Sequence, residues 1–329
     1  MEAAHERKEL MREPRDEKQL MLSYPPTKPQ SYPWLVIGDG KDQERQTFFS
    51  ISEECFNPRF IPEMCNKVIC TSTNGWLVLK DLNSMNFCLL NPTSKEMVQL
   101  PSLDGINDKV ICILSSTPRN HNHQCHVVFI DTKASMFYFC RLGDDKFNKQ
   151  AFETNRPMFF LDATFHGGKI YFLICYGPLF YPLITAEIVD SEIRFTELET
   201  EELSKPSPLD IICSVDYLIE SCGELLYVHK MLFGLHKRKV YGFLVFRMDF
   251  SEKKWVQMKN IGKRTIFLSE RRAMCCFVEE KGVQRNSIYF TKADRFLYVF
   301  DFEDESISKS LPCSTVAYQG LEHNWVMLS

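Results

Sequence analysis

The sequence has few glycines and no dense cluster of cysteines. Only 14 of its 329 residues are Gly, whereas 26 are Phe and aromatic residues make up 13%. This balance favours β-strands. The 13 cysteines are an odd number, are scattered, and include no Cys-x-x-Cys pair, which excludes a zinc ribbon and a disulfide-dense scaffold. Most lie in apolar runs, so we expect free thiols in a reducing compartment.

The chain also lacks a strong excess of charge of either sign. Its net charge is -4, with 25% charged and 44% hydrophobic residues, which is typical of a globular domain. Such a balance gives no overall attraction to nucleic acid or to acidic membranes. We therefore expect neither as a partner.

No targeting segment is visible. The first thirty residues contain six basic and six acidic side chains and no apolar core of a signal peptide. Residues 170–186 carry no charge, but they are short for a membrane span and contain Pro178 and Pro182. They predict two buried strands joined by an apolar loop. We expect an intracellular protein, cytoplasmic or nuclear.

Motifs that carry catalysis are missing. The sequence has no P-loop, no His-Glu-x-x-His, no Gly-x-Ser-x-Gly and no kinase signature. The one group with metal-ligand residue types, His121 to His126, lies in a polar stretch with no second ligand pair at finger spacing. We therefore expect no catalytic residues, no metal and no cofactor.

Short apolar segments dominate the chain from Trp34 onward. They are rich in Val, Ile, Phe, Tyr and Trp, are bounded by Asn, Gly, Asp, Pro and Ser, and show no sustained helical period. This pattern predicts an all-β domain over residues 33–329. Residues 1–32 are charged and then Pro-rich, which predicts a flexible N-terminal extension.

The predicted strands recur in units. Each unit has a turn, a strand, a second strand that often ends in Asp or Asn, a polar turn and a third strand. The spacing is about 45 to 60 residues, which is typical of propeller blades. Five units are visible, at residues 74–101, 127–147, 166–195, 222–258 and 286–308.

One such unit cannot bury both faces of its sheet, whereas radial stacking of units can. Strands near Trp34 and Phe48, with the segment Leu321–Val326, supply a closing sixth unit. The sequence therefore predicts a six-bladed β-propeller, with five or seven blades or two large β-sandwiches as alternatives. The Asp residues that end second strands, such as Asp249, are predicted to accept backbone N–H groups in the following turn.

Several segments occur in a specific order along the chain: Pro33–Val36, Asn74–Leu77, Leu90–Thr93, Ser221–Leu226, Val245–Ser251, Ile261–Ser269, Asn286–Thr291 and Phe300–Glu303. As an ordered set, they resemble the plant KIB-type β-propeller domain that accompanies F-boxes. The resemblance covers about residues 33 to 329. It implies a β-propeller that recognises a protein target, as in the substrate receptors of Skp-cullin ubiquitin ligases.

Residues 1–32 depart from that family pattern. An F-box requires about forty residues of packed helices with an early Leu-Pro, whereas this segment is short and polar, with Leu10, Leu20 and Leu22 as its Leu residues. We therefore do not expect the sequence to bind a Skp adaptor.

Two segments are candidates for partner contact. The stretch 176–182 contains Phe180 and Tyr181, and aromatic residues at a loop tip are typical of interface anchors. Residues 229–272 hold twelve Lys or Arg against three acids, which favours steering of a charged partner. The basic candidates are Lys237, Arg238, Lys239, Arg271 and Arg272. The alternative for the aromatic loop is burial over a propeller face, and the alternative for the basic segment is ordinary solvated loops. Tyr241 and Trp255 are predicted to face the core.

The sequence thus favours a non-enzymatic protein-interaction module that binds a protein target of unknown identity. A hydrolase with a site in the propeller channel and a degenerate paralogue without an F-box are the alternatives. An enzyme would require His, Asp or Glu side chains that converge from several blades.

Overall fold

The structure is a computed structural model, and it describes most of the chain in segments. These are residues 22–28, 30–39, 43–84, 86–103, 105–106, 110–118, 125–154, 158–176, 182–201, 213–233, 239–270, 272–279, 281–292, 296–312 and 323–328. Strands β1 to β25 make up the fold, and the described residues contain one 3-10 turn, Pro62–Met64, and no α-helix. The all-β prediction is confirmed.

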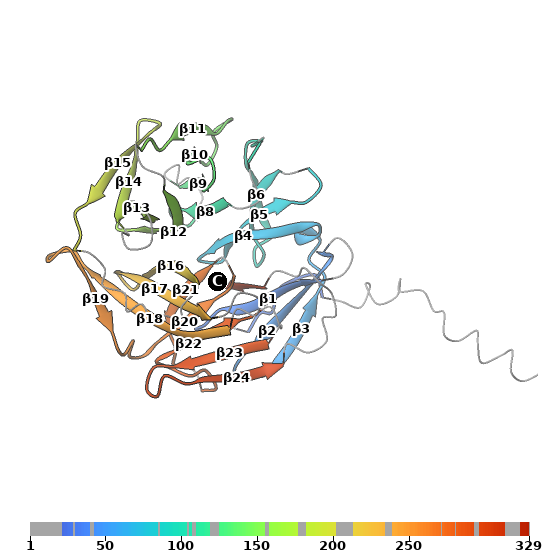
Figure 1. The fold of residues 1–329 in the computed structure, drawn as a ribbon. Helices are drawn as coiled ribbons and strands as arrows, with labels where there is room; N and C mark the ends of the chain where they lie inside the picture. Colours follow the sequence, from blue (N-terminus) through green and yellow to red (C-terminus); the bar gives the residue numbers. More distant parts are fainter. Residues whose placement is uncertain are drawn as a thin grey trace, which may run out of the picture.

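The strands form six sheets, the blades, which surround a central axis (Figure 1). From the axis outward, blade 1 contains β25 (His323–Val326), β1 (Trp34–Asp39), β2 (Arg45–Ser50) and β3 (Cys55–Arg59). Blade 2 contains β4 (Lys67–Thr73), β5 (Trp76–Asp81), β6 (Phe87–Asn91) and β7 (Glu96–Gln99). Blade 3 contains β8 (Val110–Leu114), β9 (His126–Asp131), β10 (Met136–Arg141) and β11 (Asn148–Ala151).

The second half of the ring follows the same order. Blade 4 contains β12 (Phe159–His166), β13 (Lys169–Cys175), β14 (Leu183–Val189) and β15 (Glu192–Leu198). Blade 5 contains β16 (Cys213–Ser221), β17 (Glu224–Phe233), β18 (Lys239–Asp249) and β19 (Lys254–Met258). Blade 6 contains β21 (Ala273–Phe277), β20 (Arg264–Leu268), β22 (Ser287–Thr291), β23 (Phe296–Asp301) and β24 (Ile307–Pro312).

Blade 1 joins the two ends of the described chain. Strand β25 pairs with β1 in antiparallel register, with Leu35 opposite Trp325 and Ile37 opposite His323. The Trp325 carbonyl also accepts a hydrogen bond from Ser72 Oγ at 3.2 Å, which ties blade 1 to blade 2. The six-bladed prediction, including its closing blade, is confirmed.

The blades have more strands than the predicted three-strand unit: blades 2 to 5 each have an additional inner strand (β4, β8, β12 and β16), and blade 6 has two, β20 and β21. Strand β20 pairs with β22 in parallel, and β21 then turns back to become the innermost strand. The sequence prediction omitted β21. Its sequence Ala-Met-Cys-Cys-Phe is short and has no clear alternation of polar and apolar residues.

The propeller has two distinct faces. Inner strands of neighbouring blades pack against one another along the axis. We call the face on which they end the turn face, since tight turns such as Asn74-Gly75, Gly167-Gly168 and Cys222-Gly223 join them there to the second strands. Each of these pairs has positive φ at both residues, as two-residue hairpin turns require. The opposite face, where the second strands pass to the third strands, we call the loop face.

Side chains at strand ends fix the polar turns, as predicted for Asp249. Its Oδ1 accepts the N–H groups of Ser251 at 3.0 Å and Glu252 at 3.1 Å. The same arrangement recurs at other strand ends, where the acceptors are Asp81, Asn91, Asp131 and Asp301. These side chains stabilise turns, because they satisfy backbone donors that strand pairing leaves free.

Aromatic rings fill the space between blades 3 and 4. The fully buried Phe137 of β10 lies with its ring centroid 5.1 to 5.7 Å from those of Phe160, Phe172 and Phe195. Gln150 also joins the two blades through its side-chain amide, which donates to the Ile193 carbonyl and accepts from the Ile193 N–H, both at 2.7 Å. Neighbouring blades are therefore held together by buried apolar surface and by side-chain-to-backbone hydrogen bonds.

The described N-terminal residues contact blade 1. Tyr32 is fully buried, and its hydroxyl lies 2.9 Å from Ser50 Oγ and 2.6 Å from Ser52 Oγ. The eleven cysteines whose side chains the structure describes are free thiols. Residues 170–186 form β13, the start of β14 and their connection, as predicted, and the described part of the chain has no helix that is long and apolar enough to cross a membrane.

Candidate functional site

A cavity of about 560 Å³ lies on the propeller axis and opens toward the turn face. It is lined by the C-terminal halves of four inner strands, β4, β8, β12 and β16, together with β21 and Met327. Ligand pockets commonly have volumes of ~300 to 1,000 Å³, so the cavity is large enough for a small ligand or for side chains of a bound segment.

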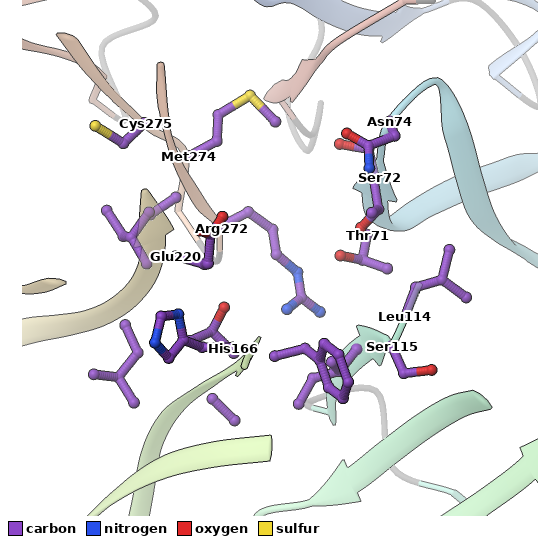
Figure 2. A pocket seen from close by; sticks show the side chains of 18 of the residues that line it. Thr71, Ser72, Asn74, Leu114, Ser115, His166, Glu220, Arg272, Met274 and Cys275 are labelled. Carbon is purple, nitrogen blue, oxygen red and sulfur yellow. The ribbon is translucent and has the colours of Figure 1, made fainter. Parts of the chain in front are cut away.

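Arg272 is the most prominent side chain of the cavity. Figure 2 shows it extending from the start of β21 toward the centre of the pocket, with Thr71 and Ser115 on one side and His166 on the other. Its Nε donates to the Cys70 carbonyl of β4 at 2.7 Å. This bond links blade 6 to blade 2 and holds the guanidinium in place.

Asp162 of β12 lies at the same inner end of the cavity and is 7% exposed. Its Oδ2 accepts the Leu218 N–H at 2.9 Å, which joins blade 4 to blade 5. Burial raises the pKa of the Asp162 carboxyl to about 7, although the nearby positive charge of Arg272 and the N–H groups of Leu218 and Ala163 act to lower it. The carboxyl therefore changes charge near neutral pH.

This raised pKa predicts a pH-dependent stability. Because the folded-state pKa of about 7 lies above the ordinary pKa of an Asp side chain in an unfolded chain, the folded state binds the proton more tightly. The contribution of Asp162 to stability is present in acid and is lost as the pH rises to about 7. We expect Asp162→Asn to remove this slope and to raise the free energy of unfolding at pH 8 by up to about 3 kcal/mol.

Urea denaturation of both proteins across this pH range measures the effect. Asp190→Asn is the matched control, since Asp190 is exposed in the β14–β15 turn, and should keep the slope of the parent. An unchanged slope in Asp162→Asn would show that Asp162 titrates in its ordinary range.

A buried polar cluster lies beside the cavity in blade 5. Asp216 Oδ1 accepts the Tyr227 hydroxyl and lies 2.7 Å from His229 Nδ1, and Ser214 Oγ donates to Asp216 Oδ2 at 3.1 Å. Asp216, Tyr227 and His229 are all buried on strands β16 and β17. Asp216 and His229 are cross-strand partners, so the cluster joins the two strands within the blade.

Most predicted contact residues belong to chain connections outside the described residues. Phe180 and Tyr181 lie between β13 and β14, and Lys237 and Arg238 between β17 and β18; all four are outside the described residues. Lys239 is described, as the exposed first residue of β18. In chain order, the first four positions follow a second strand and precede a third strand, whereas Lys239 itself begins a third strand.

The two remaining candidates flank the start of β21. Strand β20 runs parallel to the second strand β22, so its connection to β21 also lies on the loop face. Arg271 in this connection is outside the described residues. Arg272 is directed into the cavity instead of outward, so the structure separates it from the surface candidates.

Three exposed aromatic side chains lie at strand ends on the loop face. Phe159 begins β12 and is 66% exposed, Phe233 ends β17 and is 46% exposed, and Tyr241 near the start of β18 is 63% exposed. The prediction that Tyr241 faces the core is wrong, whereas Trp255 is buried as predicted. Strands β17 and β18 are the longest of the fold, so their hairpin extends past the part of the blade that neighbouring sheets cover.

The basic segment 229–272 does not form one continuous patch. Arg247 Nη1 lies 3.3 Å from Glu224 Oε1, and Arg264 forms an ion pair with the other carboxylate oxygen of Glu224. Lys230 is buried, and burial lowers its pKa to about 8. Folding disperses these charges because the segment passes back and forth between faces, leaving Lys239 as the exposed cation at the start of β18.

Metal binding finds no support in the described part of the chain. No group of three or more His, Cys, Asp or Glu side chains is arranged there to hold a metal ion. In the group His121 to His126, which has metal-ligand residue types, His121 and His123 lie outside the described residues. Cys125 directly precedes β9, and His126 is its first residue.

The six blades, the axial cavity and the two unlike faces define this protein as a β-propeller. More narrowly, the chain belongs to the KIB1-4 β-propeller family, whose model matches residues 48–317. The expected family resemblance is thereby confirmed.

Relatives in Arabidopsis thaliana include F-box proteins. The putative F-box protein At3g25750 is 25% identical over 67% of this chain and 61% of its own length. The F-box/kelch-repeat protein KIB1 is 22% identical over 80% of this chain and 66% of its own length. The chain thus spans about half to two thirds of the length of the curated relatives it matches.

Similarity to solved structures is weak. The WD40 domain of SCAP from fission yeast has a TM-score of 0.37 at 11% identity, over 75% of this chain and 56% of that one. This likeness supports no inference about function.

Proposed function

We propose that this propeller is a non-catalytic interaction module that binds a protein target through its loop face. The observation that carries this proposal is the exposure of Phe159, Phe233 and Tyr241 at strand ends on that face. Large aromatic side chains are enriched among the anchors of protein interfaces. The predicted contact residues Phe180 and Tyr181 follow β13 and precede β14 in the sequence and lie outside the described residues.

Charge on the loop face favours a partner segment with carboxylates. Lys239 is exposed beside Phe233, its cross-strand partner, and Tyr241 follows two residues later. Lys237, Arg238 and Arg271 are the further basic candidates, and they lie outside the described residues. Cations around aromatic anchors orient a partner and raise its rate of association.

The ionisable side chains of the cavity support a non-catalytic role because they are engaged separately. Glu220 Oε1 accepts the Gly223 N–H at 2.9 Å in the turn that follows β16. His166 stacks on Phe250, with ring centroids 5.8 Å apart. Asp162 accepts backbone N–H groups. Within the described residues, no hydrogen bond or ion pair joins any two of these three side chains, as an acid–base pair would require.

The relationship to plant F-box proteins supports target recognition within a ubiquitin ligase as the biological setting. We propose that residues 33–329 form the recognition domain and residues 1–32 an extension. The polar character of residues 1–32 still predicts no Skp adaptor binding by this segment. Affinity purification from the native tissue, probed for Skp adaptor and cullin, tests both statements. Recovery of these subunits with this chain would support the ligase setting and would contradict the prediction that the chain does not bind a Skp adaptor.

Removing the exposed aromatics should abolish target binding. We expect Phe233→Ser combined with Tyr241→Ser to weaken binding of a target identified by affinity purification by at least about 30-fold, the effect of losing a typical interface anchor. The unfolding temperature should stay close to that of the parent, because both side chains are exposed. Calorimetric titration with the purified target measures the affinity.

Phe277→Ser is the matched control. Phe277 is 50% exposed and ends β21 on the turn face, so its loss should leave binding unchanged. Equal losses from both variants would assign the target to another surface. A large drop in unfolding temperature in the double variant would instead favour a packing role for the two aromatics.

A further inference from the structure

The inner end of the axial cavity presents a fixed and unsatisfied cation. Arg272 uses Nε to hold the Cys70 carbonyl at 2.7 Å. Among the described residues its Nη1 and Nη2 have no hydrogen-bond acceptor and no ion-pair partner within 4.0 Å. A guanidinium held at one nitrogen still presents its two terminal nitrogens as a planar fork. In Figure 2 this end of the side chain is directed into the open space of the cavity.

The cavity wall around Arg272 is mostly neutral. On one side lie the hydroxyls of Thr71, Ser72 and Ser115, and apolar side chains such as Met274 and Met327 line other parts. The acidic side chains of the lining are Glu220, whose Oε1 is engaged in its turn, and Asp162, which is buried and accepts backbone N–H groups. Neither forms an ion pair with Arg272 within the described residues.

We propose that the cavity binds a carboxylate, held by the terminal nitrogens of Arg272 and approached from the turn face. Arg pairs with carboxylates through two parallel N–H···O bonds, which a planar fork matches in shape. The hydroxyls of Thr71, Ser72 and Ser115 are suited to donate to the remaining oxygen lone pairs. The methionines would contact the aliphatic body of the ligand.

A carboxylate can reach this cavity as a free small acid or as the side chain of a Glu in a bound segment. The cavity volume of about 560 Å³ accommodates both. The site lies away from the loop-face aromatics, so the proposal is independent of target binding there. It is also distinct from catalysis, since it requires only binding.

Two methionines allow the site to be observed directly. We would label the protein with ¹³C at Met methyl groups and assign Met274 and Met327 through Met274→Leu and Met327→Leu. Titrations would use glutarate as the free acid and acetyl-Gly-Gly-Glu-Gly-Gly-amide as the segment, with the Gln form of the peptide as its control. We expect saturable shifts of Met274 and Met327, and none of Met97, which is exposed on the outer strand β7.

Variants connect the shifts to the proposed contact. Arg272→Lys keeps a positive charge but loses the fork, and should weaken binding about tenfold or more. Asp162→Asn removes the negative charge nearest the site, and should tighten binding at pH 8. Arg194→Gln, on the exposed side of β15, should leave the affinity unchanged. The loop-face variant Phe233→Ser with Tyr241→Ser should also leave it unchanged.

Each outcome decides the proposal. The proposal is supported if either carboxylate probe binds and this binding is weakened in Arg272→Lys. The relative affinity of the two probes then shows whether the carboxylate comes from a free acid or from a Glu side chain. Absence of shifts with both probes at about 20 mM would overturn it, since that excludes even millimolar affinity. Equal binding of the Gln peptide, or shifts that persist unchanged in Arg272→Lys, would also overturn it. If Arg272→Lys unfolds, a failure of Asp162→Asn to tighten binding contradicts the proposal.

Discussion

Replacing Trp325 with Ala should cost the protein about 3–5 kcal/mol of folding free energy, which is the usual loss for a buried Trp. Trp325 is 4% exposed, its ring lies 5.0 Å from that of Phe267 in blade 6, and it pairs with Leu35 of β1. It therefore joins the two ends of the chain and packs blade 1 against blade 6. Urea denaturation followed by circular dichroism measures the loss.

Tyr241→Ala is the control for this substitution. Tyr241 is a large aromatic that is 63% exposed, so its removal should change the free energy of unfolding by less than about 0.5 kcal/mol.

A chain that ends at Pro312 lacks β25 altogether and should lose cooperative unfolding, since β1 is left with an open inner edge. Parent-like unfolding of the shortened chain would contradict ring closure.

Phe137→Ala should have an effect of similar size, about 3–5 kcal/mol, for a different reason. Phe137 is fully buried at the contact of blades 3 and 4, where its ring faces those of Phe160, Phe172 and Phe195. Its removal leaves a cavity that surrounding β-strands cannot close, and it also deletes edge-to-face ring contacts. The same denaturation experiment applies.

Phe159→Ala in β12 of blade 4 is the matched substitution. Phe159 is 66% exposed, so its loss should change stability only slightly. Comparable losses from Phe137→Ala and Phe159→Ala would show that blades 3 and 4 do not pack through the Phe137 ring cluster.

The sequence predicts most of the fold because a blade is a local unit. The repeat of turn, strand, strand and strand predicts blades 2 to 6, and the turn role of Asp249 follows from the adjacent Phe250-Ser251 alone. Closure by the C-terminal segment is predictable since one unit at each end of the chain is incomplete. Strand β21 was missed because its five residues lack an alternating pattern. It also pairs with β20, whereas the inner strands of the other blades pair directly with the second strand of their blade.

The cavity could not be predicted from any local pattern. Arg272 and Cys70 are 202 residues apart, and Asp162 meets Leu218 across 56 residues. Arg272 was recognised from sequence as a basic residue of a charged stretch, whereas its role in the cavity depends on the ring. Tyr241 was misjudged because alternation identifies which side of a sheet a residue faces, and only the structure shows where the neighbouring blade ends.

The structure thereby divides the molecule into two working surfaces. The loop face carries exposed aromatics and Lys239, and the turn face leads to a cavity with Arg272 at its inner end. Separate surfaces allow a macromolecular target and a carboxylate ligand to bind at the same time. Coupling between them would be measured as a change in target affinity on addition of glutarate.

Hydrogen exchange at the two ends of the chain tests ring closure most directly. The amides of residues 34–37 and 323–326 pair with each other across blade 1, so they should exchange slowly and together. Leu35→Pro should release the amides of both segments while those of blade 3 stay protected, because Pro removes a donor and disrupts the pairing. Rapid exchange of residues 323–326 in the parent protein, or release confined to residues 34–37 in the variant, would contradict the six-bladed ring.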